Sequence, residues 1–188
     1  MLLIQMLVSG CRLQIIKRMT NTILALDTGT EQTGYCIVNI DSYRPLEFGK
    51  VSNDTILKII DKFDGERIVF ERFAPQQRTG LTTITSIVWY GRFIERCQAN
   101  GYDEGRIEQI YRRDVKKALL GKFDKSKGTA DSQLRKYLVA RFAEFDKVRG
   151  KGTKDNPDWF YGFGTTDVYA AYCVGIVYLD SLHNDKKE

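Results

Sequence analysis

The sequence predicts an α/β protein with one mixed, five-stranded sheet and helices packed on it. Two observations predict this class. Three short apolar segments joined by brief connections come first, which is typical of an antiparallel meander. Helical and strand-like segments then alternate, and the chain closes on helices, which is typical of a single α/β domain.

Residues 22–28 form the first predicted strand, because the run TILALDT is apolar and carries Asp27 just before the turn residues that follow. Residues 34–40 and 45–51 are predicted to be the second and third strands. The connections between the three strands are short, so we expect them to pair antiparallel.

A helix is predicted over residues 54–63, with Asn53 or Asp54 as its N-cap. Its apolar residues have helical spacing; they are Ile56, Ile59, Ile60 and Phe63. The next strand, residues 67–71, has the sequence RIVFE and, like the first, places an acid at its end, here Glu71.

The second half of the chain is predicted to be richer in helix. After a polar loop at 72–80, the segments in order are an amphipathic stretch from about Leu81 to Cys97, a strand at 107–111, a basic helix at 112–121, a Lys/Gly loop at 122–130, a helix from near Asp131, a second loop at 149–159 and a closing helix at 165–182.

The 188 residues suit one domain with a full hydrophobic core. We expect residues 1–18 to be an extension and residues 19–188 to form the domain. The extension is apolar and then basic, the reverse of a secretory signal, and it is too short to span a bilayer. We therefore expect no membrane partner, and a functional chain that begins at Met19.

Composition narrows the chemistry. Lys and Arg number 29 against 24 Asp and Glu, a modest excess that suits a polyanion-binding protein but is also common in ordinary soluble proteins. The four cysteines are scattered singly, which argues against a zinc site and indicates a reducing compartment, the cytoplasm. The only histidine, His183, lies in the polar tail. Catalysis would therefore use carboxylates, lysines or a bound metal.

Three carboxylates form the most informative group. Asp27 and Glu71 end two strands, and Asp167 lies in the first turn of the closing helix. If the first and fourth strands are neighbours, their ends meet at one edge of the sheet. Clustered carboxylates repel one another, and Mg²⁺ removes that penalty because it prefers hard oxygen ligands. Taken singly, each acid also fits an ordinary turn, surface or helix-start position.

Four segments resemble the RuvC-type Holliday junction resolvases of the ribonuclease H-like superfamily, and most of all the forms carried by phages of Gram-positive hosts. They are ILALDTGTEQTGYCIV at 23–38, IVFERF at 68–73, YRRDVKKALLGKFDKSKGTADSQLRKYL at 111–138 and GFGTTDVYAAYCVGIVYL at 162–179. The resemblance implies a ribonuclease H-like fold. It also implies that Asp27, Glu71 and Asp167 are catalytic acids that bind two Mg²⁺ ions, for which Mn²⁺ would substitute.

The sequence departs from the family at one position. The family usually carries two acids three residues apart on the closing helix, and Gly164 stands three residues before Asp167. Either three carboxylates suffice, or Asp155 or Asp158 from the preceding loop joins the site. Of these two, Asp158 is the candidate metal ligand.

Basic residues are the candidate DNA contacts. Short-range clusters of this kind bind phosphates without regard to sequence, although charge alone also fits a solvated helix face. They are Arg112, Arg113, Lys116, Lys117, Lys122, Lys125 and Lys127. The resemblance places this segment beside the active site. Phe73 and Arg78, in the loop after Glu71, are candidates for gripping the junction, the aromatic ring by stacking on a base.

The resemblance further implies that the segment Leu81–Cys97 supplies the twofold interface of a homodimer. A four-way junction is nearly twofold symmetric, so such a dimer offers one active site to each of two opposed strands. The leading hypothesis is thus a homodimeric, Mg²⁺-dependent endonuclease that nicks branched DNA in pairs.

Three alternatives stay open at this stage. The chain is a related nuclease that prefers forks or flaps, or a catalytically weak or inactive protein that binds branched DNA, as the missing acid at Gly164 would suggest. The motif LDTGT also resembles the phosphate loop of actin-like ATPases. Those folds need a second domain and a second phosphate loop, so an ATPase fragment is the least favoured of the three.

Overall fold

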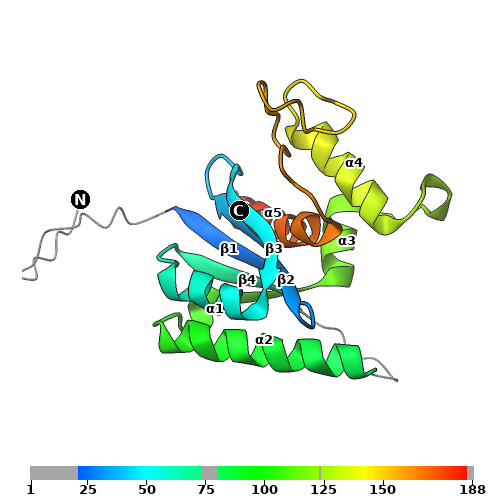
Figure 1. Cartoon of the computed structure of the whole chain (residues 1–188). Coiled ribbons are helices and arrows are strands. Elements are labelled where there is room, and N and C mark those ends of the chain that lie inside the picture. The colour runs from blue at the N-terminus through cyan, green and yellow to red at the C-terminus, as the bar shows by residue number, and fades with distance from the viewer. Residues whose placement is uncertain (1–20, 73–79, 123, 186–188) are drawn as a thin grey trace, which may run out of the picture.

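The computed structural model describes residues 21–72, 80–122 and 124–185. A five-stranded sheet runs through its centre, in the order β3-β2-β1-β4-β5 (Figure 1). The strands are β1 (Thr22–Asp27), β2 (Gln32–Asn39), β3 (Pro45–Ser52), β4 (Arg67–Arg72) and β5 (Ile107–Tyr111). β1, β2 and β3 pair antiparallel, whereas β1 with β4 and β4 with β5 are parallel. The predicted mixed sheet is therefore confirmed. The expected extension at 1–18 lies outside the described residues.

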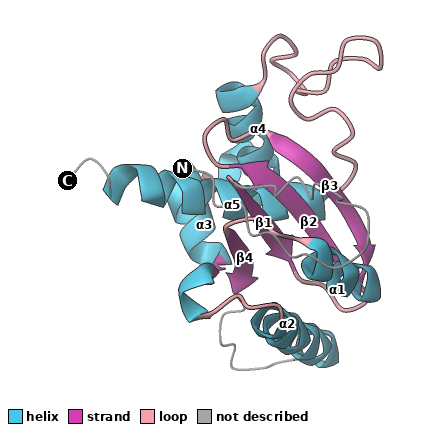
Figure 2. Ribbon diagram, turned by 90° about the vertical axis from the view of Figure 1, so that its left-hand side faces the viewer, coloured by secondary structure: helices cyan, strands magenta, loops and turns pink. Residues whose placement is uncertain are grey.

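Helices cover both faces of this sheet. They are α1 (Asn53–Lys62), α2 (Leu81–Ala99), α3 (Arg112–Leu120), α4 (Ala130–Phe142) and α5 (Thr166–Asp185). α1 and α2 pack on one face, and α5 lies on the other with α3 and α4 beside it (Figures 1 and 2). None of the helices in the described ranges is both long enough and apolar enough to cross a membrane.

The central strand β1 is buried from both sides, which explains its unbroken apolar run. Leu24 and Leu26 belong to the core beneath α1 and α2, and Ile23 belongs to the core beneath α5. A Cβ on Gly175 of α5 would lie 3.2 Å from the Cβ of Ala25, so two small residues let helix and strand approach closely. The cysteines at 36, 97 and 173 are buried and free.

The predicted N-cap of α1 is wrong, because the cap lies one residue before the nearer of the two candidates. The hydroxyl of Ser52, not Asn53 or Asp54, accepts the N–H of Thr55 at 3.3 Å. Asn53 is buried and holds the β1–β2 turn instead. Its amide donates to the carbonyl oxygens of Gly29 and Thr30 at 3.1 and 3.2 Å, and its side-chain oxygen accepts from the Thr33 hydroxyl at 2.7 Å. This turn directly follows Asp27.

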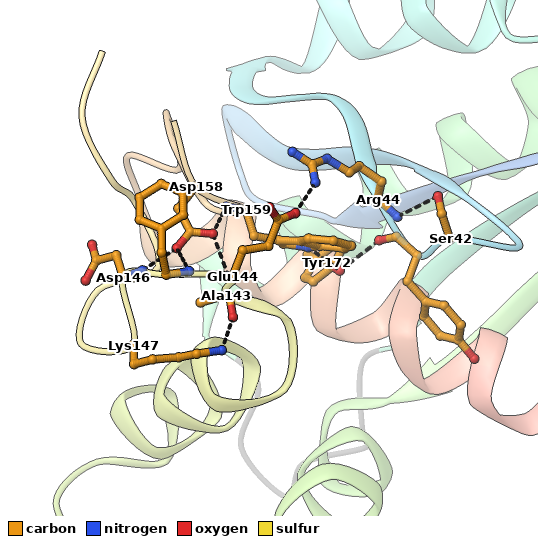
Figure 3. Close-up of polar contacts among 11 residues, drawn as sticks. Ser42, Arg44, Ala143, Glu144, Asp146, Lys147, Asp158, Trp159 and Tyr172 are labelled. Atoms are coloured by element: carbon orange, nitrogen blue, oxygen red, sulfur yellow. Dashed lines mark hydrogen bonds and ion pairs between the residues drawn. The ribbon is translucent and has the colours of Figure 1, made fainter. Parts of the chain in front are cut away.

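The connection between α4 and α5 is long, and it contains no helix or strand beyond one bridge between Gly152 and Pro157. It is tied to the body of the protein by hydrogen bonds (Figure 3). Trp159 donates from Nε1 to the hydroxyl of Tyr172 at 3.0 Å, and that hydroxyl donates to the carbonyl of Tyr43 at 2.8 Å. The end of the α4–α5 connection is thereby fixed against α5 and the β2–β3 turn.

Candidate active site

Asp27 and Glu71 end adjacent strands. In the parallel pairing of β1 with β4, Leu26 lies opposite Phe70, so the next residues, Asp27 and Glu71, follow side by side at the carboxyl edge of the sheet. The condition set by the sequence, that the first and fourth strands are neighbours, is met. Two carboxylates from different strands therefore share one end of the sheet.

Asp167 reaches the same edge because β2 carries a glycine there. Gly34 is the register partner of Asp27, and a Cβ on Gly34 would lie only 2.4 Å from the carbonyl oxygen of Asp167. The missing side chain lets the first turn of α5 rest directly on the sheet. Gly34 lies in the segment at 23–38 that resembles the resolvases, seven residues after Asp27, and this contact is a physical reason for a glycine at that position.

The row of residues across the sheet continues to a lysine. Lys50 of β3 pairs in register with Gly34, and its Nζ lies 2.7 Å from Oδ2 of Asp167. This hydrogen bond, followed by the charge of Asp167, raises the pKa of Lys50. An open, polar cavity lies over this row; it is lined by Asp27, Thr28, Gly29, Thr30, Glu31, Gln32, Lys50, Arg112 and Asp167.

Arg112 of α3 is the second positively charged side chain that contacts these carboxylates. Its Nη1 donates to both oxygens of Glu71, at 3.1 and 3.2 Å, and its Nη2 donates to Oδ1 of Asp131 at 3.0 Å. The sequence predicted Arg112 as a DNA contact, but it gave no role to Lys50 or Asp131. Both were missed because register and helix packing, not sequence spacing, bring them to the site.

The pKa of Asp27 reflects the charged side chains around it. Burial raises the pKa of Asp27 to about 7, and the charge of Glu71 adds to this effect, while Arg112 works against it. Burial also raises the pKa of Glu71, again opposed by Arg112. Removing carboxylates from water and placing them together penalises their charged forms. Because a cation would offset this penalty, the site favours binding of positive charge.

The donor set fits a hard divalent cation in its chemistry. Asp27 is a half-buried carboxylate, and the adjacent Thr28 hydroxyl is buried without a hydrogen-bond partner, so both have oxygens to offer. Glu71 and Asp167, in contrast, are engaged by Arg112 and Lys50. Within the described ranges no three acidic, histidine or cysteine side chains form a ready-made metal site. For Glu71 and Asp167 to coordinate a metal ion fully, the side chains of Arg112 and Lys50 would have to release them.

The prediction that Asp158 is a metal ligand is wrong, because the structure gives this side chain another role. Its Oδ1 accepts the backbone N–H groups of Glu144 and Trp159, at 2.8 and 2.6 Å. Its Oδ2 accepts those of Phe145 and Asp146, at 3.1 and 2.6 Å (Figure 3). Burial works to raise the pKa of Asp158, but these N–H donors outweigh it and hold the pKa below its usual range. Both oxygens are used to shape the α4–α5 connection.

The predicted basic segment borders the carboxylates through α3. Val115 and Leu119 are buried, so the helix turns its basic residues away from the core. Lys116 lines a pocket together with Glu71. The positive charge of Lys116 works to lower the pKa of Glu71. The remaining basic candidates are exposed; they are Arg113, Lys117, Lys122, Lys125 and Lys127. Phe73 and Arg78 lie outside the described residues.

The raised pKa of Asp27 predicts a stability cost in the metal-free protein. The folded protein keeps this proton up to about pH 7, whereas the unfolded chain, with the ordinary value of 3.8, loses it earlier. Stability therefore falls as pH rises between these values and stays lower above pH 7. Asp27→Asn removes the cost, so at pH 8 with EDTA its Tm should exceed that of the wild type by roughly 2–4 °C per kcal/mol recovered. Thermal unfolding at pH 4 and pH 8 measures this. A Tm difference that does not grow with pH would contradict it.

Comparison with known proteins identifies the fold. No protein-family model matches the sequence, and no curated protein matches it. Solved structures do match. Thermus thermophilus RuvC has a TM-score of 0.56 at 14% identity, covering 87% of this chain and 96% of that one. T. thermophilus RuvC in complex with a Holliday junction substrate gives 0.50 at 13% identity, covering 83% and 90%. Ydc2, the yeast mitochondrial Holliday junction resolvase, gives 0.51 at 11% identity, covering 84% and 77%. The chain therefore has the RuvC-type, ribonuclease H-like fold that its motifs led us to expect.

Proposed function

We propose that this protein is a metal-dependent endonuclease that resolves Holliday junctions and related branched DNA by paired nicks. The observation that carries the proposal is the meeting of Asp27, Glu71 and Asp167 at one edge of a RuvC-type sheet. Relatives in fold include a resolvase and a RuvC bound to a junction, which supports the same substrate class here. Membership of the phage branch and a cytoplasmic location remain predictions from the sequence.

Each side chain at the site has a proposed role. Asp27, Glu71 and Asp167 would hold Mg²⁺, or Mn²⁺ in its place, with two ions in each site. Bound cations of this kind activate water and stabilise the departing oxygen of a phosphodiester. Lys50 and Arg112 neutralise Asp167 and Glu71 in the metal-free protein. Once released, their N–H groups are suited to hold the substrate phosphate, since charge-assisted hydrogen bonds to phosphate are strong.

The basic face of α3 would bind the DNA backbone beside the cut. Arg113 and Lys117 are exposed and lie on the same helix as Arg112, which reaches the carboxylates. Contacts of this kind fix the register of DNA without reading its sequence. We expect binding to weaken steeply with salt, as it does for any interface dominated by phosphate contacts.

A junction-cleavage assay tests the proposal. The protein is incubated with Mg²⁺ and labelled substrates of matched sequence: a four-way junction, a fork, a flap and a linear duplex. Paired nicks in the branched substrates, with the duplex left intact and with EDTA blocking cleavage, are the expected result. Cleavage that is equal on the linear duplex would overturn the structure specificity.

The same assay decides a second candidate function, binding without cutting. Two observations favour it: Gly164 lacks a side chain where related resolvases are expected to carry an acid, and two of the three acids are paired with Lys50 and Arg112. Tight binding of the junction with no nicks under Mg²⁺ or Mn²⁺ would establish this function in place of the nuclease.

A homodimer is also proposed, formed through α2. Four apolar residues of this helix are exposed: Leu81 by 79%, Ile84 by 49%, Ile87 by 45% and Val88 by 57%. Leu81, Ile84 and Val88 follow helical spacing and so lie on one side of α2. An exposed apolar stripe of this kind marks an interaction surface, and a second copy of the chain is the partner that a twofold junction requires.

Val88→Asp is predicted to convert the dimer to a monomer, because a charge in the centre of an apolar interface stays desolvated and unpaired. Analytical ultracentrifugation measures the change in mass. Val148→Asp is the matched control, since Val148 is even more exposed, at 85%, but lies in the α4–α5 connection. A wild-type protein that sediments as a monomer at micromolar concentration would refute the proposed dimer.

A further inference from the structure

A second cavity lies beside the proposed site, between the end of β4, α3, α4 and the start of α5. This α3–α4–α5 pocket is partly open, has a volume of about 100 Å³ and is lined mainly by apolar surface. Its apolar wall is formed by Val115, Leu134, Tyr169, Ala170 and Cys173. A closed apolar cavity of about 150 Å³ binds benzene, so a space of this order admits a single aromatic ring but not a base pair.

Positive charge borders the apolar wall. Arg112, Lys116 and Arg135 all line the α3–α4–α5 pocket. The guanidinium carbon of Arg135 lies 5.3 Å from the centre of the Tyr169 ring, which places this charge beside the wall. Glu71 and Asp131 line the pocket too, but Arg112 donates hydrogen bonds to both of these carboxylates. Lys116 and Arg135 are therefore the cations that an entering ligand would meet.

Arg112 connects this pocket with the acids of the proposed site. Its side chain lines the α3–α4–α5 pocket and also the open, polar cavity over Asp27 and Asp167. The two spaces are thus neighbours that share one side chain as a wall. A DNA strand whose phosphate lies over the acids would place an adjoining nucleotide beside the α3–α4–α5 pocket.

A nucleobase matches the lining of this pocket. Its two faces suit apolar walls, and its polar edge needs a few hydrogen-bonding groups, which the hydroxyls of Thr165 and Thr166 supply at the pocket. The phosphate attached to the nucleotide suits the bordering cations. A base stacked inside a duplex cannot enter, whereas an unpaired base at a branch point can enter at the least cost. The lining therefore favours a single unpaired nucleotide over duplex DNA.

We propose, on the basis of the function proposed above, that the α3–α4–α5 pocket binds one unpaired base of the branch point, next to the phosphate that is cut. Lys116 and Arg135 bind the phosphate of that nucleotide, and the apolar wall covers the faces of its base. Arg112 stands between this nucleotide and the acids. Binding of the base would hold the strand in position over Asp27, Glu71 and Asp167.

Filling the pocket tests this role. Ala170 is partly exposed and lines the pocket, so Ala170→Leu places a larger side chain there without crowding the buried core. Ala140→Leu is the matched control, because it makes the same change at an exposed position of the neighbouring helix α4, outside the pocket. Fluorescence anisotropy in Ca²⁺ measures the affinity of each protein for a four-way junction and for a set of junctions that each lack one base near the branch.

Removal of one particular base should weaken binding by the wild type and by Ala140→Leu about tenfold, as loss of one bound base generally does. Ala170→Leu should bind the intact junction about tenfold more weakly than the wild type does. It should bind that abasic junction as tightly as the wild type does, which also shows that the variant is folded. Ala170→Leu binding of the intact junction at wild-type strength, or a wild type that responds to no abasic site, would overturn the role of the pocket.

Further measurements separate this proposal from the proposed nuclease. Nicking in Mg²⁺ is scored on the same junctions, and a wild type that shows base-dependent binding but no nicks would overturn the nuclease and leave the pocket's role standing. A wild type that binds no junction would overturn both. Free deoxynucleoside monophosphates are titrated as a second source of the same chemistry. If one of them binds as tightly as the junction does, the pocket belongs to a free nucleotide and the branch-point base is overturned.

Discussion

Replacing Asp27 by asparagine is expected to abolish strand cleavage while binding of a four-way junction stays intact or becomes tighter. Asparagine keeps the shape of the side chain, so the buried end of β1 is undisturbed. It removes a carboxylate whose charge interacts with those of Glu71 and Asp167, and with it an oxygen that the proposed cation would use. Loss of several kcal/mol of metal-assisted stabilisation slows cleavage on the order of 10³-fold or more. One repulsion against the DNA phosphates also disappears.

Two assays on the same protein separate these effects. Nicking of a labelled junction in Mg²⁺ gives the rate, and a gel shift in Ca²⁺ or EDTA gives the affinity. Asp103→Asn is the control, because Asp103 is an exposed aspartate between α2 and β5 whose loss changes the net charge equally. Full cleavage by the Asp27→Asn protein would refute the assigned site, and loss of both cleavage and binding would indicate damage to the fold.

The fold was predictable because each strand carries its own signal. β1 is an unbroken apolar run since it is covered on both faces, and short connections dictate the antiparallel pairing of β1, β2 and β3. Capping was harder to predict, since Ser52, Asn53 and Asp54 are all good N-caps by type. The structure selects Ser52 because Asn53 is buried under the β1–β2 turn. Burial of this kind depends on the packed structure.

The candidate site was predictable only in part, for a related reason. Asp27 and Glu71 could be paired from sequence because parallel neighbouring strands place their carboxyl ends together. Lys50 could not, since its approach to Asp167 depends on the register of β3 with β2. Asp131 could not either, because its contact with Arg112 depends on how α4 packs beside α3.

The error at Asp158 has its own physical cause. A loop aspartate close to the start of α5 looks like a free ligand in sequence. The connection between α4 and α5 has few backbone partners of its own, so its N–H groups need acceptors once they are buried. Asp158 supplies four of these bonds. A buried carboxylate whose oxygens are satisfied in this way has little capacity left for a metal.

Gly34→Ala is expected to produce the second large effect, a loss of both stability and cleavage. The new Cβ would lie 2.4 Å from the carbonyl oxygen of Asp167 and 2.9 Å from its Cβ. Backbone atoms cannot yield as a flexible side chain does, so the first turn of α5 must move off the sheet. Overpacking of this kind costs about 1–3 kcal/mol, or a fall in Tm of roughly 2–12 °C for a protein of this size.

The displacement matters more for chemistry than for stability, because it carries Asp167 away from Asp27 at the edge of the sheet. A shift of about 1 Å in a catalytic group is enough to cost on the order of 10²-fold in rate. Gly164→Ala is the matched control, since it adds the same methyl near the start of α5 but meets only one atom at 4.0 Å. Thermal unfolding and junction nicking should therefore separate the two alanine variants. Equal behaviour of both would show that the close contact between β2 and α5 does not position Asp167.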